Sequence, residues 1–172
     1  MKIAIVSDTH NNWANFEKAI KWIMNEKIQL ILHCGDICNQ ETIDKAKKLF
    51  EGPSFAKASE GRGIKFVKGN GDFDLPDLPD ELKMEVEGAF AEASATRRKI
   101  GMSHFPAEAK KMAQSGKFDM VFYGHTHRPW DEKVNNCHMI NPGELAGQFY
   151  KPTFAVYDTV TGKLELKILE KL

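Results

Sequence analysis

The sequence lacks any long apolar run, and this absence excludes a membrane-spanning protein. None of its apolar runs approaches the length of about 18 residues that a transmembrane helix needs. The apolar N-terminal stretch, residues 1–6, is followed at once by Ser7 and Asp8 and is too short for a signal peptide. We therefore expect a cytoplasmic protein that does not associate with a membrane.

The sequence also lacks an excess of either charge. It contains 24 Lys and Arg residues against 24 Asp and Glu residues. Proteins that coat nucleic acid depend on an excess of Lys and Arg to neutralise phosphates. Local basic clusters, such as Arg97, Arg98 and Lys99, indicate a solvated surface. We therefore expect no stable binding of nucleic acid.

Cysteine is scarce, and its spacing fits no familiar redox or zinc motif. Cys34 and Cys38 are separated by three residues, and Cys137 makes the total odd. In a chain without an export signal this pattern predicts reduced thiols. We expect Cys34 and Cys38 to be small buried apolar residues.

The length and the apolar patterns of the sequence predict a single α/β domain over residues 1–172. A chain of this length supports a core without disulfides. The first half alternates between short β-branched apolar runs and segments with apolar residues at helical spacing. The expected strands cover residues 2–7, 28–33 and 64–68. The expected helices cover residues 13–25, after a cap at Asn11 or Asn12, and 41–50. This order predicts a parallel sheet with right-handed crossovers.

The second half is richer in strands. We expect a helix over residues 106–115 and strands over 82–86, 97–103, 119–123, 133–140, 153–157 and 164–169, the last three as an antiparallel set. Two stretches, 52–63 and 88–96, interrupt this regularity, and we interpret them as surface insertions without a catalytic role.

Side chains that bind metals follow five of the expected strands. Ligands of open α/β sheets gather beyond the carboxyl ends of the strands, so these side chains are expected to meet. Carboxylates can bridge two cations and neutral imidazoles complete their shells, whereas the absence of sulfur disfavours iron–sulfur chemistry. Glycines precede several of these residues and allow close backbone approach. The set comprises Asp8, His10, Asp36, Asn70, His104, His125 and His127.

This ordered set resembles the five motifs of the calcineurin-like metallophosphoesterases. The matching segments are Asp8-Thr9-His10, Gly35-Asp36, Gly69-Asn70, His104 and Gly124-His125-Thr126-His127. The resemblance covers nearly the whole chain and is greatest to the small phosphodiesterases without a cap domain, whose C-terminal signature is similar to residues 141–143. It implies a four-layer α-β-β-α sandwich with two mixed β-sheets.

The resemblance also implies roles for the seven residues. Asp8, His10 and His127 would hold one divalent ion, Asp36 would bridge to a second, and Asn70, His104 and His125 would complete the second site. We expect manganese first, with nickel, iron, cobalt or zinc as alternatives. A hydroxide bridging the two ions would attack a small phosphodiester, and catalysis would depend most directly on Asp36, Asn70 and His104.

The sequence departs from this family at two positions. Larger members carry a His directly after the motif Asn, where this chain has Gly71, so no obvious general acid is present. We therefore predict efficient hydrolysis only of esters with good leaving groups. Glu144 replaces a Ser that is common in relatives and adds charge near the site. We also expect Asp72 to orient the ligands, and His33 either to do so or simply to pack beside Asp36.

Two other functions remain compatible with the pattern. A eukaryotic retromer subunit with the same fold has degraded ligand positions and acts as a protein-binding scaffold. Here every ligand position is filled, which favours an enzyme. A phosphomonoesterase or a nuclease could use the same centre, but the missing His at position 71 and the neutral charge disfavour them.

Overall fold

A computed structural model describes residues 1–52, 62–91 and 94–172. One sheet contains the parallel strands β1 (Lys2–Val6), β2 (Leu30–His33) and β3 (Gly63–Phe66). Strands β9 (Thr153–Asp158) and β10 (Leu164–Ile168) extend it in antiparallel orientation, in the order β10-β9-β1-β2-β3. The parallel sheet predicted for the first half is therefore correct, and two C-terminal strands make it mixed.

The second sheet has the order β4-β5-β6-β8-β7. Its strands are β4 (Glu81–Ala91), β5 (Ser94–Ser103), β6 (Met120–Phe122), β7 (Trp130–Val134) and β8 (Cys137–Asn141). Strands β5, β6 and β8 are parallel, whereas the edge strands β4 and β7 run antiparallel to their neighbours. This sheet is also mixed.

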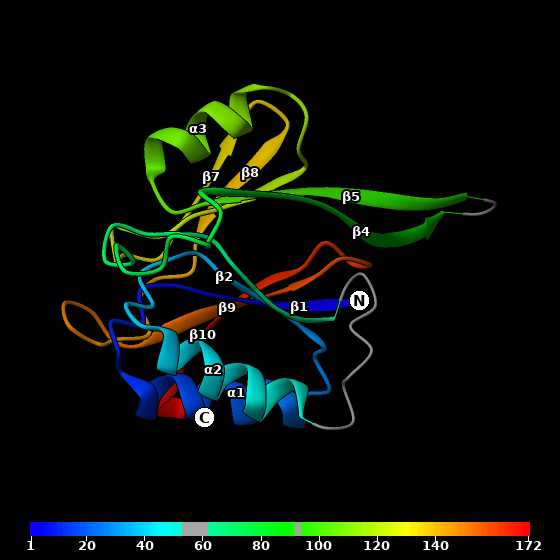
Figure 1. The fold of residues 1–172 in the computed structure, drawn as a ribbon. Coiled ribbons are helices and arrows are strands. Elements are labelled where there is room, and N and C mark those ends of the chain that lie inside the picture. The colour runs from blue at the N-terminus through cyan, green and yellow to red at the C-terminus, as the bar shows by residue number, and fades with distance from the viewer. Residues whose placement is uncertain (53–61, 92–93) are drawn as a thin grey trace.

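Helices cover the outer face of each sheet (Figure 1). Helices α1 (Trp13–Asn25) and α2 (Gln40–Glu51) lie on the first sheet, and α3 (Pro106–Gln114) lies on the second. A short 3-10 helix, Leu169–Lys171, follows β10. The four-layer α-β-β-α sandwich that the resemblance implies is therefore confirmed.

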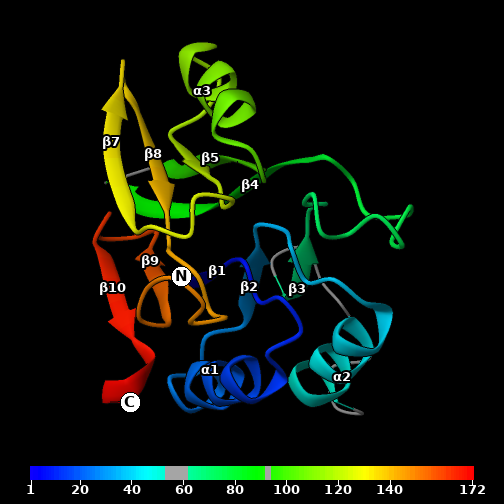
Figure 2. The same ribbon diagram turned by 90° about the vertical axis from the view of Figure 1, so that its left-hand side faces the viewer.

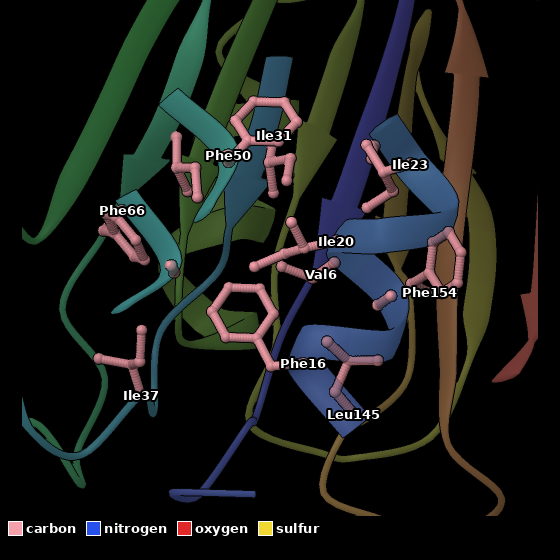
Figure 3. Packing of buried hydrophobic residues seen from close by; sticks show 14 of the residues in the cluster. Val6, Phe16, Ile20, Ile23, Ile31, Ile37, Phe50, Phe66, Leu145 and Phe154 are labelled. Atoms are coloured by element: carbon pink, nitrogen blue, oxygen red, sulfur yellow. The ribbon is translucent and has the colours of Figure 1, made fainter. Parts of the chain in front are cut away.

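Three buried apolar clusters lie between the four layers. On β1, Ala4 and Val6 face the helices, whereas Ile3 and Ile5 face the other sheet. Because both faces are buried, the strand is a continuous apolar run rather than an alternating one. Figure 3 shows Phe16 and Ile20 of α1 against Val6 in the first cluster. The third cluster joins α3 to the second sheet.

Helix α1 begins where the sequence predicts it. The Asn12 side chain accepts a hydrogen bond from Asn15 N at 3.2 Å and caps the helix. Phe16, Ile20 and Ile23 then recur at helical spacing and are fully buried. The loop between β1 and α1, which carries Asp8 and His10, is thus held between a buried strand and a capped helix.

Two predicted segments have a different structure. Residues 133–140 form parts of two strands, because Asn135 has φ of 56° and turns β7 into β8. Of these, β8 pairs with β6 in parallel, so residues 133–140 do not join β9 and β10 in one antiparallel set.

The supposed insertion at 88–96 is also largely strand. Residues 88–91 continue β4 and residues 94–96 begin β5, with a register shift between Glu87 and Phe90. Residues 92–93, and most of the other stretch, 53–61, lie outside the described residues. Within the described residues no helix is long and apolar enough to cross a membrane.

Candidate metal centre

The carboxyl ends of strands from both sheets meet at one side of the sandwich. Strands β1, β2 and β3 of the first sheet and β5 and β6 of the second end there, on the side that Figure 2 turns toward the viewer. The loops that follow carry all seven candidate ligands. The structure thus brings together side chains that are up to 119 residues apart in sequence, from Asp8 to His127.

One half of the site consists of Asp8, His10 and His127. Their ligand atoms all lie within 4.8 Å of one another. His127 Nε2 lies 3.6 Å from Asp8 Oδ1 and 3.3 Å from His10 Nε2, and the two imidazoles are stacked. Asp8 is fully buried, whereas His10 and His127 are partly exposed.

The other half consists of Asn70, His104 and His125. Asn70 Oδ1 lies 3.1 Å from His104 Nε2 and 2.8 Å from His125 Nδ1. His104 is buried, but Asn70 and His125 are exposed. This half of the site is therefore open to a solute.

Asp36 lies between the two halves. Its Oδ2 is 3.6 Å from His10 Nε2 on one side and 3.6 Å from His104 Nε2 on the other. The second oxygen, Oδ1, accepts a hydrogen bond from Gly71 N at 2.6 Å. One oxygen is thus held by the backbone, and the other points at both imidazoles.

In two of the histidines, the tautomer leaves the Nε2 lone pair facing an oxygen atom of another candidate ligand. His104 Nδ1 donates to Cys34 O at 2.8 Å, so its Nε2 carries a lone pair directed at Asp36 Oδ2 and Asn70 Oδ1. His127 Nδ1 donates to Glu144 Oε2 at 2.8 Å, so its Nε2 lone pair faces Asp8 Oδ1. Acceptors that converge in this way need a cation between them, and the donor set therefore fits a metal.

The separations also have the size that metal coordination requires. With bonds of about 2.1 Å, neighbouring ligand atoms around an ion are about 3.0–3.4 Å apart. The distances between candidate ligand atoms, 2.8–3.6 Å for the close pairs, bracket this range.

The backbone at the site is held in an unusual conformation. Five of the candidate ligands, Asp8, His10, Asp36, His125 and His127, have φ between 44° and 69°. Left-handed backbone at a non-glycine residue costs on the order of 1 kcal/mol each and persists only where the surroundings enforce it. Such concentrated strain at one place is typical of functional sites.

Two of the glycines that precede ligands allow close packing between the loops. A Cβ on Gly69 would overlap Asp36, and a Cβ on Gly124 would overlap Ser7. The expectation that glycine permits close backbone approach here is confirmed. The contact of Gly124 with Ser7 brings a loop of the second sheet against a loop of the first.

Hydrogen bonds to Asp72 connect the two loops that carry Asp36 and Asn70. The Asp72 carboxylate is fully buried and accepts hydrogen bonds from Asp36 N and Gly69 N at 2.8 Å and from Cys38 N at 2.6 Å. Asp72 therefore acts on the backbone that carries Asp36 and Asn70, rather than on their side chains.

His33 is a packed histidine that also supports the loop after β2. Its Nδ1 accepts from Gly35 N at 3.3 Å, and its Nε2 therefore donates to Thr9 Oγ1 at 2.7 Å. The ring contacts Phe16 and Phe66. Burial lowers the pKa of His33 to about 4, so the ring is neutral at pH 7.

Glu144 contacts the candidate ligand His127, a role that the sequence did not indicate. It is fully buried and, besides His127, it accepts hydrogen bonds from Phe149 N and Tyr150 N at 2.6 Å and from Gln148 N at 3.1 Å. Burial opposes its charge, but these hydrogen bonds, led by that of Tyr150, hold the pKa of Glu144 below its usual range. No motif or spacing in the sequence indicates that Glu144 contacts His127.

Burial shifts the pKa of three candidate ligands, Asp8, His10 and His104, in directions that suit the binding of a cation. It raises the pKa of Asp8 to about 7, because an ionised carboxylate there has little solvent. It lowers the pKa of His10 and His104, so both imidazoles are neutral near pH 7. A divalent ion would compensate the buried charge of Asp8 and would bind the neutral imidazoles directly.

All three cysteines are free, and of the two that we expected to be buried, Cys34 and Cys38, only Cys34 is. Cys34 is fully buried, but Cys38 is half-buried and lies 3.6 Å from His10 Nδ1. Burial raises the pKa of Cys38 to about 12, so the sulfur remains a thiol. The prediction of a buried apolar role is wrong for Cys38, which instead supports the His10 ring.

Comparison with known families agrees with this geometry. Residues 1–162 match the calcineurin-like phosphoesterase superfamily domain. The chain belongs to this superfamily, whose members are metal-dependent, and the family predicted from the motifs is confirmed.

Individual relatives are similar over their full length. The chain is 30% identical to phosphodiesterase MJ0936 of Methanocaldococcus jannaschii, over 99% of this chain and 100% of the relative. A structure described as a novel archaeal phosphodiesterase superposes with a TM-score of 0.76 at 26% identity, covering 98% of this chain and 99% of the other. Vps29 of Entamoeba histolytica complexed with Zn²⁺ has a TM-score of 0.64 at 18% identity over 97% of both chains, which shows a shared fold alone.

Proposed function

We propose that the protein is a phosphodiesterase with two divalent metal ions, and that all seven candidate ligands hold them. Asp8, His10 and His127 bind the first ion, Asn70, His104 and His125 bind the second, and Asp36 bridges both. The observation that supports this most directly is the convergence of Asp36 Oδ2 on His10 Nε2 and His104 Nε2 at 3.6 Å each. Manganese is the first metal to test.

Bound in this way, two divalent ions would supply a hydroxide nucleophile near neutral pH and would neutralise charge on the phosphoryl oxygens. The protein's own residues orient this chemistry. Asp36 is held by Gly71 N, and the exposed Asn70 amide is placed to donate a hydrogen bond to a phosphoryl oxygen from its nitrogen while its oxygen faces His104 and His125.

The centre is arranged for diesters rather than for monoesters. Gly71 stands where larger relatives carry a His, and no side chain at this position can protonate a leaving group. A monoester dianion and an alkyl leaving group both make greater demands on such an acid than an activated diester does. The relative MJ0936, named a phosphodiesterase, supports this choice of substrate class.

The test is to strip the protein with chelator and restore each divalent metal in turn. Hydrolysis of bis(4-nitrophenyl) phosphate and of 4-nitrophenyl phosphate is then compared, together with the number of ions bound per chain. We expect activity to require about two ions and to favour the diester. The variant Asp36→Asn should lose both ions and lower the rate by orders of magnitude.

Each outcome separates the alternatives. A preference for the monoester would retain the metal centre and refute the diester assignment. Tight binding of two ions without hydrolysis of either ester would favour the scaffold function. Near-normal turnover in Asp36→Asn would refute the bridging role.

A further inference from the structure

A pocket lined by aromatic side chains lies beside the loop that carries His125 and His127. It has a volume of about 360 Å³. The seven candidate ligands contribute nothing to its walls, and the proposed chemistry leaves its residues without a role. It is lined by Tyr123, Thr126, Arg128, Trp130 and Tyr150.

Two walls of this aromatic pocket are directly connected to the metal centre. Thr126 stands between His125 and His127 in sequence, and consecutive Cα atoms are about 3.8 Å apart. Tyr150 follows Phe149, whose ring packs edge-on against His127 with centroids 5.0 Å apart. The backbone N–H groups of Phe149 and Tyr150 both donate to Glu144, so one buried carboxylate positions this wall and the ligand His127 together.

Two of the three aromatic rings in the pocket, those of Trp130 and Tyr150, are exposed to solvent. Trp130 is 47% exposed and Tyr150 is 49% exposed. Exposed aromatic faces at a defined site bind planar groups by stacking, and they do so for any base or aryl ring.

Among the described residues, two polar side chains of the pocket, Arg128 and Tyr123, lack a polar partner, whereas Thr126 Oγ1 accepts a hydrogen bond from Asn141 Nδ2 at 3.0 Å. Arg128 lies over the Trp130 ring at 5.3 Å and has no acidic partner within ion-pair distance in the described part of the chain. Tyr123 is only 4% exposed, yet its hydroxyl has no hydrogen-bond partner among the residues that the structure describes. In the described part of the chain, the buried side-chain atoms without a partner are Ser7 Oγ and Arg98 Nε, so the Tyr123 hydroxyl is accessible from the pocket and is available to a ligand.

We infer that this pocket binds the planar aromatic substituent of the phosphodiester, an aryl or nucleobase group, while the phosphate lies at the metal centre. The inference rests on the proposed function. Trp130 and Tyr150 supply stacking surfaces, Tyr123 supplies a hydrogen bond, and Arg128 supplies a cation that stacks on a ring or pairs with an acceptor. The pocket thus selects the organic substituent of the phosphodiester, whereas the metal centre acts on the phosphate group.

The test measures binding separately from turnover. Manganese-loaded protein is titrated by calorimetry with methylphosphonate, phenylphosphonate and an adenine-bearing acyclic phosphonate, whose carbon–phosphorus bonds are not esters. We expect the two aromatic phosphonates to bind about 5- to 100-fold more tightly than methylphosphonate. Comparison of the phenyl and adenine ligands distinguishes a general aryl site from a nucleobase site.

Two variants make the expectation specific. Trp130→Ala and Tyr150→Ala should each remove most of the preference for aromatic ligands and leave methylphosphonate binding unchanged. Tyr150→Ala keeps the backbone bond to Glu144, so it tests the pocket even if Trp130→Ala fails to fold. Val160→Ala, at a 43% exposed position outside the pocket, is the control and should behave as wild type.

Equal binding of all three phosphonates, or a preference that survives in both variants, would overturn the inference. If the preference exists and is lost in the variants while no diester is hydrolysed, the pocket is supported and the proposed phosphodiesterase function fails. Diester hydrolysis without any aromatic preference would support that function and reject the pocket.

Discussion

Glu144 Oε2 accepts a hydrogen bond from Nδ1 of the candidate ligand His127 at 2.8 Å. A carboxylate in this place holds the imidazole in the tautomer whose Nε2 faces Asp8, and it increases the basicity of the ligand. The same carboxylate accepts three backbone N–H groups from residues 148–150. One buried side chain thus controls a ligand and the loop beside it.

Glu144→Gln should weaken the first metal site. If the amide oxygen keeps the bonds to Phe149 and Tyr150, the amide N–H group faces His127 and favours the tautomer that carries a proton on Nε2. We expect metal affinity at this site to fall about 10- to 100-fold. Metal titration of the stripped protein should then show one tightly bound ion in place of two. Glu41→Gln, at a side chain 72% exposed on α2, is the matched control, and unchanged affinity in Glu144→Gln would contradict the role.

Asp72→Asn should reduce stability as well as metal binding. An amide has one acceptor oxygen, so at least one of the backbone donors from Asp36, Cys38 and Gly69 would lose its partner in a buried place. We expect the free energy of unfolding of the metal-free protein to fall by about 2–4 kcal/mol. Urea unfolding in chelator measures it, with the exposed Asp74→Asn as control. An unfolding free energy equal to that of the control would show that the three bonds are dispensable.

Hydrolysis rates should depend steeply on the leaving group. Without a general acid, the departing oxygen must carry its own charge, and such an acid is worth about 10²–10⁴-fold. The measurement is kcat/KM for a series of aryl methyl phosphates whose phenols differ in pKa, extended to an alkyl ester. A flat series would reveal an acid elsewhere in the site.

Adding the missing histidine should not flatten this dependence. A Cβ at position 71 would lie 2.9 Å from Cys38 Sγ and 3.2 Å from Asp36 Oδ1. Gly71→His should therefore displace the Asp36 carboxylate, the proposed bridge, and lower metal binding. A rise in the rate of alkyl ester hydrolysis in this variant would contradict the steric argument.

The sequence predicted most of the elements and the edge of the sandwich at which the candidate ligands gather, because both depend on short-range patterns. Buried strands are continuous apolar runs, and the ligands follow those strands directly, so chain order alone places Asp36 and His104 at the same edge. The hairpin at Asn135 was missed because its two strands read as one apolar-alternating segment, and a single residue with φ of 56° divides them.

Other features depend on contacts that no local pattern encodes. Glu144 reaches His127 only because the β7–β8 hairpin folds residues 130–141 back on themselves. Asp8 and Asp36 have left-handed backbone, a conformation that favours glycine, and the local sequence does not indicate it at either aspartate. The aromatic pocket joins Tyr123, Trp130 and Tyr150 from three segments, none of which is distinctive alone.

The metal-free protein should be destabilised by the charge of Asp8. Its pKa is about 7 in the folded state against an ordinary value of 3.8, so between these values the folded state binds more protons than the unfolded state. The free energy of unfolding therefore falls as pH rises through this window, and the loss is complete above pH 7. Asp8→Asn, which cannot ionise, avoids this loss.

We expect Asp8→Asn to gain stability relative to wild type between pH 4 and pH 8, by on the order of 2–4 kcal/mol, when both proteins are unfolded by urea in chelator. His33, whose pKa is lowered to about 4, produces the opposite trend in both proteins, so the difference between them isolates Asp8. Adding manganese at pH 8 should reverse the order, because wild type gains binding free energy that the variant lacks. A difference in stability that does not change with pH would show that Asp8 is already ionised in the metal-free fold.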